Sequence, residues 1–188
     1  MHEGMVLRIG AMLLGYPEKA RLEAALTAVR EIGDAPEPLV RFLEAASMLQ
    51  ETDLDQQYVA TFDFREDLSL YLTFQELGDA RDRAPALLAL KEHLRRCGYE
   101  CPDEELPDYL PLLLEFLAER WPSREDPLER RIAHALHGIA GRMDAGSTYL
   151  PLVQAILQAL PAPAEGSGAT PPRGDEEDRA LPYPLRYL

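Results

Sequence analysis

Residues 58–117 read YVATFDFREDLSLYLTFQELGDARDRAPALLALKEHLRRCGYECPDEELPDYLPLLLEFL. Aromatic side chains stand close to acidic ones throughout this stretch. Among the aromatic residues of this stretch are Tyr58, Phe62, Phe64, Tyr71, Phe74, Tyr109 and Phe116, and among its acids are Asp63, Glu66, Asp67, Glu76, Asp79, Glu105, Asp108 and Glu115. A plain amphipathic core requires no such mixture, so we interpret the stretch as a binding surface.

Two long helices are predicted in the second half of this stretch. The first begins at Gly78 and Asp79 and runs through Arg96 to Gly98, with Pro85 near its first turns. Its inward face consists of Leu87, Leu90 and Leu94. The second carries Leu110, Leu113, Leu114 and Leu117 on one face, with Asp108 as its N-cap and Pro111 in its first turn.

The segment before these helices alternates Leu68, Leu70 and Leu72, a pattern that suits a short strand. No other part of the sequence shows a matching alternation, and a lone strand would leave its backbone groups unpaired. We therefore predict a loop followed by a helix. Arg81 and Arg83 stand beside Asp79 and Asp82, which favours local ion pairs at the start of the helix that follows.

The rest of the chain also predicts helices. Apolar residues recur at helical spacing over 3–14, from Leu22 to Val29, from Leu39 to Ala46, from Leu54 to Phe62 with Thr52 or Asp53 as cap, from Ile132 to Met143 and from Leu150 to Leu160. Leu, Ala and Glu dominate, while β-branched residues are scarce. The prediction is an all-α, single-domain bundle of about eight or nine helices over residues 1–160. Residues 161–188 are rich in Pro, Gly and acids, which predicts a disordered tail, although it ends in the apolar LPYPLRYL.

The formal net charge is −14, and two segments, 51–82 and 99–129, carry the excess of acids. Such a surface repels nucleic acid and anionic lipid and attracts basic partners. The N-terminal segment lacks the features of a signal peptide, and no apolar run reaches the roughly 20 residues of a membrane span. Two cysteines do not form a disulfide framework. We expect a cytoplasmic protein without membrane insertion or nucleic acid binding.

Enzyme signatures are weak in this sequence. His93, Cys97 and Cys101 are spaced by four and could offer three metal ligands, with His134 or His137 as a fourth, but Gly98 and Pro102 interrupt the helix that would align them. Glu105 and Asp108 could serve as the acid and base of a small hydrolase, although nothing marks a substrate pocket. We expect no catalytic residue, no metal and no cofactor. The hydrolase and the metal enzyme stay as alternatives, as does a helical adaptor for some other basic partner.

Four fragments in this order resemble a known family. They are YVATFDF at 58–64, LYLTFQELGDARDR at 70–83, ALLALKEHLRRCGYE at 86–100 and ELPDYLPLLLEF at 105–116. They are similar to the respiratory nitrate reductase assembly chaperones (NarJ type, or delta subunit), within the TorD-like redox-enzyme maturation chaperones. The resemblance covers most of residues 5–160. Tyr109 stands where the wider group has histidine, so no histidine-dependent property is carried over.

The resemblance implies an all-helical chaperone domain over 1–160 with no activity of its own. Such a protein binds the catalytic (alpha) subunit of nitrate reductase, chiefly its N-terminal segment, and supports molybdenum cofactor insertion before membrane docking, with cofactor-delivery proteins as further partners. A basic client would meet the acids and aromatic residues identified above. The expected client-peptide contacts are Tyr58, Asp63, Tyr71, Asp79, Arg81, Glu105, Pro107, Asp108, Tyr109 and Glu115.

Overall fold

The computed structural model describes residues 2–121 and 127–162, and over these residues it contains nine α-helices and no strand. The helices are α1 (Glu3–Leu14), α2 (Lys19–Ile32), α3 (Glu37–Met48), α4 (Glu51–Tyr58), α5 (Leu72–Leu77), α6 (Arg83–Arg96), α7 (Leu110–Glu119), α8 (Pro127–Arg142) and α9 (Leu150–Ala159). Two short turns complete the list: the π-helical turn η1 (Val59–Asp63) and the 3₁₀ turn η2 (Glu66–Leu68). The predicted all-α class and the predicted number of helices are confirmed.

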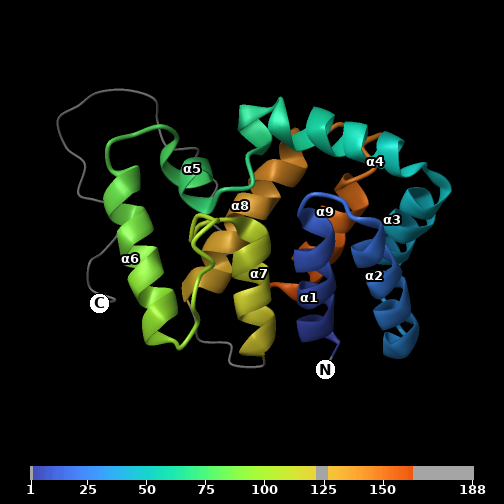
Figure 1. The fold of residues 1–188 in the computed structure, drawn as a ribbon, viewed down its shortest axis with the longest axis horizontal. Helices are drawn as coiled ribbons and strands as arrows, with labels where there is room; N and C mark the ends of the chain where they lie inside the picture. The colour runs from blue at the N-terminus through green and yellow to red at the C-terminus, as the bar shows by residue number, and fades with distance from the viewer. Residues whose placement is uncertain (1, 122–126, 163–188) are drawn as a thin grey trace.

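Helix α1 lies at the centre of the bundle and packs mainly against α7 and α9 (Figure 1). Two glycines allow this close approach. A Cβ added at Gly4 would lie 2.8 Å from Trp121 Cγ, and one added at Gly10 would lie 2.6 Å from Ile156 Cγ1. Real Cβ atoms do not approach other carbons that closely, so any side chain at these positions would push the neighbouring residue away.

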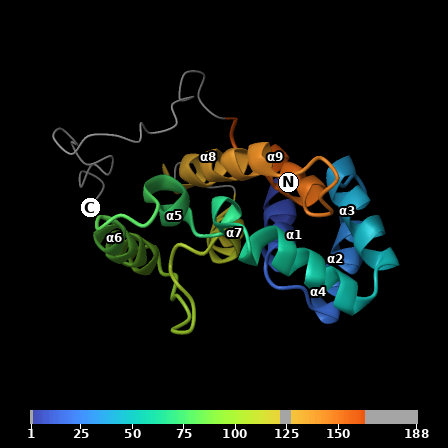
Figure 2. The same ribbon diagram turned by 90° about the horizontal axis from the view of Figure 1, so that it is seen from above.

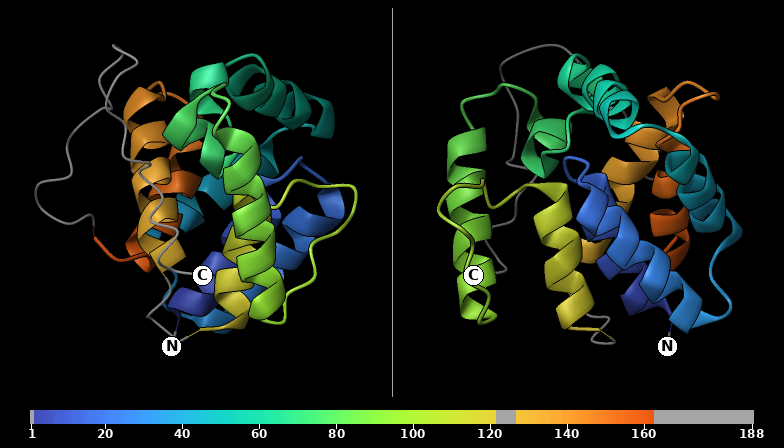
Figure 3. Two further views of the ribbon diagram at one scale, coloured as in Figure 1. Left: turned by 90° about the vertical axis from the view of Figure 1, so that its left-hand side faces the viewer. Right: turned by 45° about the vertical axis from the view of Figure 1, so that its right-hand side comes forward.

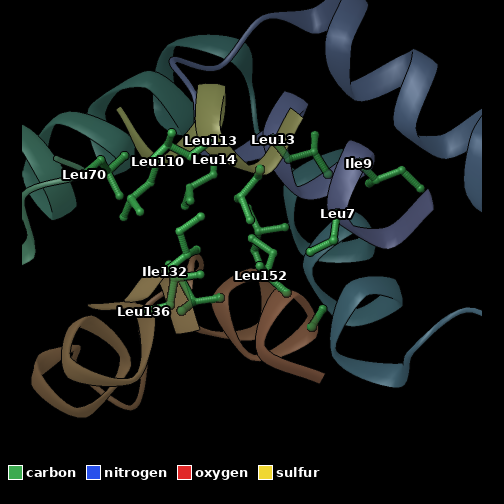
Figure 4. Packing of buried hydrophobic residues seen from close by; sticks show 14 of the residues in the cluster. Leu7, Ile9, Leu13, Leu14, Leu70, Leu110, Leu113, Ile132, Leu136 and Leu152 are labelled. Carbon is green, nitrogen blue, oxygen red and sulfur yellow. The ribbon is translucent and has the colours of Figure 1, made fainter. Parts of the chain in front are cut away.

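The hydrophobic core forms where α1, α7, α8 and α9 meet. Figure 4 shows Leu13 and Leu14 of α1 facing Leu110 and Leu113 of α7, with Ile132, Leu136 and Leu152 closing the opposite side. All of these residues are buried. Seen from above, α8 and α9 lie along one face, and α4 runs across the other side of α1 (Figure 2). The core therefore fixes α1 and α7, whose upper ends carry the candidate site.

Helices α5 and α6, which lie between Leu70 and Leu110 in the sequence, form an arm at one side of the bundle (Figure 3), where α5 also packs against α8. The arm is closed at its base by an isolated antiparallel bridge between Tyr71 and Tyr109. Leu72 N donates to Asp108 O over 2.8 Å, and Leu110 N donates to Leu70 O over 2.8 Å. The predicted loop followed by a helix is confirmed, because α5 begins at Leu72 and no strand forms among the described residues. The bridge to the segment before α7 is not predicted by any pattern in the sequence.

Two predicted helix starts differ from the observed ones and are wrong. The helix expected from Asp79 begins at Arg83, because Pro85 has no N–H for the carbonyl of Arg81 and fits only in a first turn. Helix α4 begins at Glu51, just before the expected caps, and Gln50 at its N-cap position makes no side-chain capping bond. Acids in the first turn of α4 support this start through the helix dipole.

The predicted tail over 161–188 lies outside the described residues apart from Pro161 and Ala162, so the domain boundary near 160 stays a prediction. Within 2–121 and 127–162, no helix combines the length and the apolar character that a membrane crossing requires.

Candidate functional site

Four tyrosines from four separate segments meet at the end of the bundle that carries the arm. The rings of Tyr16 and Tyr58 lie 5.4 Å apart edge to face, and the Tyr58 and Tyr109 hydroxyls are 3.4 Å apart. Tyr109 in turn packs against Tyr71 with ring centroids 5.3 Å apart. We call these four residues, together with the side chains at their edges described next, the tyrosine surface.

Two acids lie at the edge of this tyrosine cluster. Glu105 Oε1 accepts hydrogen bonds from Tyr71 Oη over 3.2 Å and from Leu106 N over 2.9 Å. The exposed Asp63 raises the pKa of both Tyr58 and Tyr109 through its negative charge, although burial is the larger cause for each. Burial, followed by the charge of Glu105, raises the pKa of Tyr71 to about 12. Tyr58, Tyr71 and Tyr109 are therefore uncharged hydrogen-bonding groups at neutral pH, beside two acidic side chains.

Apolar side chains project into solvent next to these acids. Phe64, which follows Asp63 at the end of η1, is 82% exposed, Tyr16 is 49% exposed, and Leu106, beside Glu105, is 42% exposed. The π-helical turn determines the position of Phe64, because its wider hydrogen-bonding pattern ends with Phe64 N donating to Val59 O over 3.2 Å. Exposed apolar groups interleaved with acids suit a partner that is both apolar and basic.

Asp108 lies beneath the tyrosine surface and is fully buried. Its Oδ2 accepts hydrogen bonds from Thr73 N, over 3.2 Å, and from Thr73 Oγ1. Arg83 Nη2 lies 3.7 Å from the same oxygen. The predicted role as N-cap of the helix at 110 is wrong: Tyr109 is the N-cap residue of α7, and Asp108 caps the short helix α5 instead, because the bridge brings the two segments together.

Arg83 connects the arm to the tyrosine surface. Its Nε donates to Thr73 Oγ1 over 3.2 Å, and its guanidinium lies 5.9 Å from the ring centre of Tyr71 and 5.7 Å from that of Phe74. The acid that it approaches is Asp108 rather than one of its neighbours in the sequence. A contact between residues so distant in the chain leaves no local spacing signal, which is why sequence patterns do not reveal it.

The structure brings together five of the ten predicted contact residues, namely Tyr58, Asp63, Tyr71, Glu105 and Tyr109. Of the ten, Tyr58, Pro107 and Asp108 are buried. Asp79 and Arg81 are exposed and form no ion pair with any described residue. Glu115 is exposed on α7, where it accepts a hydrogen bond from Tyr99 Oη over 3.4 Å. A role in client binding stays a prediction for all ten.

The residues of the alternative metal site do not assemble into a cluster. Cys97 Sγ lies 3.9 Å from His93 Nε2, and burial raises the pKa of the Cys101 thiol. His134 and His137 are exposed on α8. Among the described residues, no group of three or more His, Cys, Asp or Glu side chains is arranged to hold a metal ion.

A separate cavity of about 340 Å³ lies between η1 and the turn before α9. Polar and apolar residues both line it, namely Gln57, Ala60, Thr61, Arg65, Leu68, Met143, Asp144, Gly146, Ser147 and Thr148. Arg65 is already bound to Asp67 through two hydrogen bonds of 3.0 and 2.7 Å, and its Nη1 lies 3.6 Å from Asp144. The cavity therefore offers no uncompensated charge. Its two walls come from distant parts of the chain, so no sequence pattern predicts it.

A solved structure shares the fold of this chain. The crystal structure of a protein from Archaeoglobus fulgidus assigned to redox enzyme maturation superposes with a TM-score of 0.62, covering 84% of this chain and 93% of its own. Its sequence identity of 18% supports a shared fold and nothing beyond it. The all-helical architecture is thus one already found in that class.

The sequence comparisons identify the family. The model of the nitrate reductase delta subunit family matches residues 27–144. NarJ of Escherichia coli K12, named as a nitrate reductase molybdenum cofactor assembly chaperone, is 32% identical over 81% of this chain and 68% of its own length. NarJ of Bacillus subtilis is 32% identical over 79% of this chain and 84% of its own. The chain belongs to the nitrate reductase delta subunit family.

Proposed function

We propose that this protein is a molybdenum cofactor assembly chaperone for a nitrate reductase and has no catalytic activity of its own. The observation that carries the proposal is its similarity, over about four fifths of the chain, to NarJ proteins named for this role. The chaperone binds the catalytic subunit before the finished enzyme assembles and leaves it afterwards. This similarity gives the hydrolase and metal-enzyme alternatives no support.

The tyrosine surface is the part of the molecule that we propose contacts the client. A helical N-terminal segment of the catalytic subunit, apolar on one side and basic at its edge, would place its apolar side chains against Tyr16, Phe64 and Leu106. Its basic side chains would meet Asp63 and Glu105. Charge pairs of this kind speed encounter and set orientation more than they raise affinity. Proteins that deliver the cofactor are further partners in this proposal.

Contacts within and beneath the tyrosine surface support the view that its side chains are held in fixed positions. Tyr58, Tyr71 and Tyr109 hold one another through ring contacts and hydroxyl groups, and Asp108 holds the arm below them. A preorganised surface loses less conformational entropy when a partner binds. The half-buried Tyr71 and Tyr109 also offer the client hydroxyl groups beside the apolar side chains.

The test is isothermal titration of the full chain with a synthetic peptide from the N-terminus of its catalytic subunit. Asp63→Asn and Glu105→Gln, singly and together, are compared with Glu31→Gln, which removes one charge, as each single variant does, from an exposed position on α2. We expect micromolar or tighter binding to the unaltered protein. The double variant should bind about tenfold more weakly at low salt, and the difference should shrink at high salt because screening weakens exposed charge pairs.

Three outcomes would count against this proposal. Equal affinity of the double variant and Glu31→Gln would remove the two acids from the binding site. Affinity independent of salt would remove the electrostatic part of the argument. Failure of both the peptide and the intact catalytic subunit to bind would remove the chaperone function itself.

A further inference from the structure

The final segment identified in the sequence, LPYPLRYL at residues 181–188, has no role in the function proposed above. It contains three leucines, two tyrosines, two prolines and Arg186, and no acid. The preceding stretch, 163–180, contains five acids and two arginines. An apolar, aromatic and weakly basic segment is therefore joined to the described fold by a linker that is polar and acidic.

We propose that residues 181–188 dock on the tyrosine surface of their own chain when no client is bound. The docked segment would then compete with the client for the tyrosine surface. The competition rests on the proposed function, whereas the docking itself does not depend on it.

The tyrosine surface carries the complementary chemical groups. Phe64, Tyr16 and Leu106 are exposed apolar side chains with no cover among the described residues, and the leucines and tyrosines of the segment can cover them. Arg186 can pair with Asp63 or Glu105 at the edge of the surface. Two prolines restrict the segment's backbone before it binds, which lowers the entropy lost on docking.

The linker is long enough for this contact. Eighteen residues separate Ala162 from Leu181, and a fully extended chain spans at most about 3.3 Å per residue, or roughly 60 Å in total. A domain of about 160 residues has a radius of gyration near 15 Å, which corresponds to a diameter of about 40 Å. The extended linker is therefore longer than the body is wide, which allows contact with surface well away from Ala162.

The tether also sets the size of the effect. A short flexible linker gives an effective concentration of about 1 mM. If the isolated segment bound with a dissociation constant of roughly 0.1–1 mM, tethering would weaken client binding by about two- to tenfold. With competition of this size, a client of micromolar affinity would still displace the segment from the surface. When no client is bound, the segment would cover the exposed Phe64.

The first experiment compares client-peptide affinity of the full chain with that of a full-chain variant carrying Tyr183→Ser, Arg186→Glu and Tyr187→Ser. We expect the variant to bind the peptide two- to tenfold more tightly. The matched control is Arg179→Glu, which makes the same charge change just before the segment and should leave affinity unaltered. Equal affinity of all three proteins would overturn the competition.

The second experiment needs no client. A photo-crosslinking residue placed at Phe64 should react with residues 181–188 of the same chain, and excess client peptide should suppress the product. The control position is Met48, which is 87% exposed at the end of α3. A product at Phe64 alone supports docking, whereas equal yields at both positions, or no product at Phe64, would overturn it. Because this readout is obtained without a client, it separates failure of the docking from failure of the chaperone function.

Discussion

Replacement of Asp108 by alanine tests the role of the buried carboxylate directly. The change removes the acceptor for Thr73 N and Thr73 Oγ1 and the anion 3.7 Å from Arg83 Nη2. Loss of a helix cap costs about 1 kcal/mol, and loss of a hydrogen bond to a charged group costs about 1.5–3 kcal/mol. Asp108 Oδ1 has no hydrogen-bond partner among the described residues, so its removal adds no further cost.

We therefore expect Asp108→Ala to lower the free energy of unfolding by about 2–4 kcal/mol, which is a large share of the roughly 5–15 kcal/mol of an ordinary domain. Asp108→Asn keeps one acceptor oxygen and should lose about half as much. Urea unfolding followed by circular dichroism at 222 nm measures both. Glu105→Gln, nearby at the surface, serves as the control and should change stability by less than about 1 kcal/mol. A value for Asp108→Ala within about 0.5 kcal/mol of the unaltered protein would refute the assignment of Asp108 as the cap of α5.

Three further predictions follow from other contacts. Gly10→Ala places a Cβ 2.6 Å from Ile156 Cγ1, so we expect a loss of about 1–3 kcal/mol in thermal or urea unfolding, and unchanged stability would show that α1 and α9 are less closely packed. Tyr71 has its pKa raised to about 12, so its contribution to stability is complete below about pH 10 and is lost as pH rises toward 12. Tyr71→Phe should thus remove a step near pH 12 from the ultraviolet titration and reduce the loss of stability between pH 10 and 12; a step that persists would assign it to another tyrosine. Arg131→Gln breaks two 2.8 Å bonds to Glu76 that join α8 to α5, with an expected loss of about 1 kcal/mol, and no measurable loss would make this half-buried pair equivalent to a surface one.

The parts of the fold that could be predicted from the sequence are those set by local patterns. The helix over 3–14 is predicted at its observed bounds because Val6, Ile9 and Leu13 repeat every three to four residues and a Gly-Tyr-Pro turn follows. Helix α2 likewise ends before Gly33, whose φ of 74° favours glycine. Both signals lie within a few residues of the structure that they predict.

The parts that could not be predicted depend on pairing between distant segments. Tyr71 and Tyr109 lie far apart in the sequence, on either side of α5 and α6, and nothing in either neighbourhood shows that they form a bridge. Once they do, Asp108 is buried and cannot cap the helix that follows it. Tyr16 joins the tyrosine surface through a ring contact with Tyr58, although α2, α3 and α4 separate the two along the chain. It also lacks the dense neighbouring acids that drew attention to residues 58–117.

The bridge at the base of the arm also bears on dynamics. Two backbone hydrogen bonds close the loop that contains α5, α6 and the segment back to Tyr109. Such a segment can open as one cooperative unit while the central helices stay folded. Opening would separate Tyr71 from Tyr109 and uncover Asp108, so the same event would dismantle half of the tyrosine surface. Amide exchange of the arm should therefore slow when a client binds, since a partner that prefers the closed arrangement stabilises it.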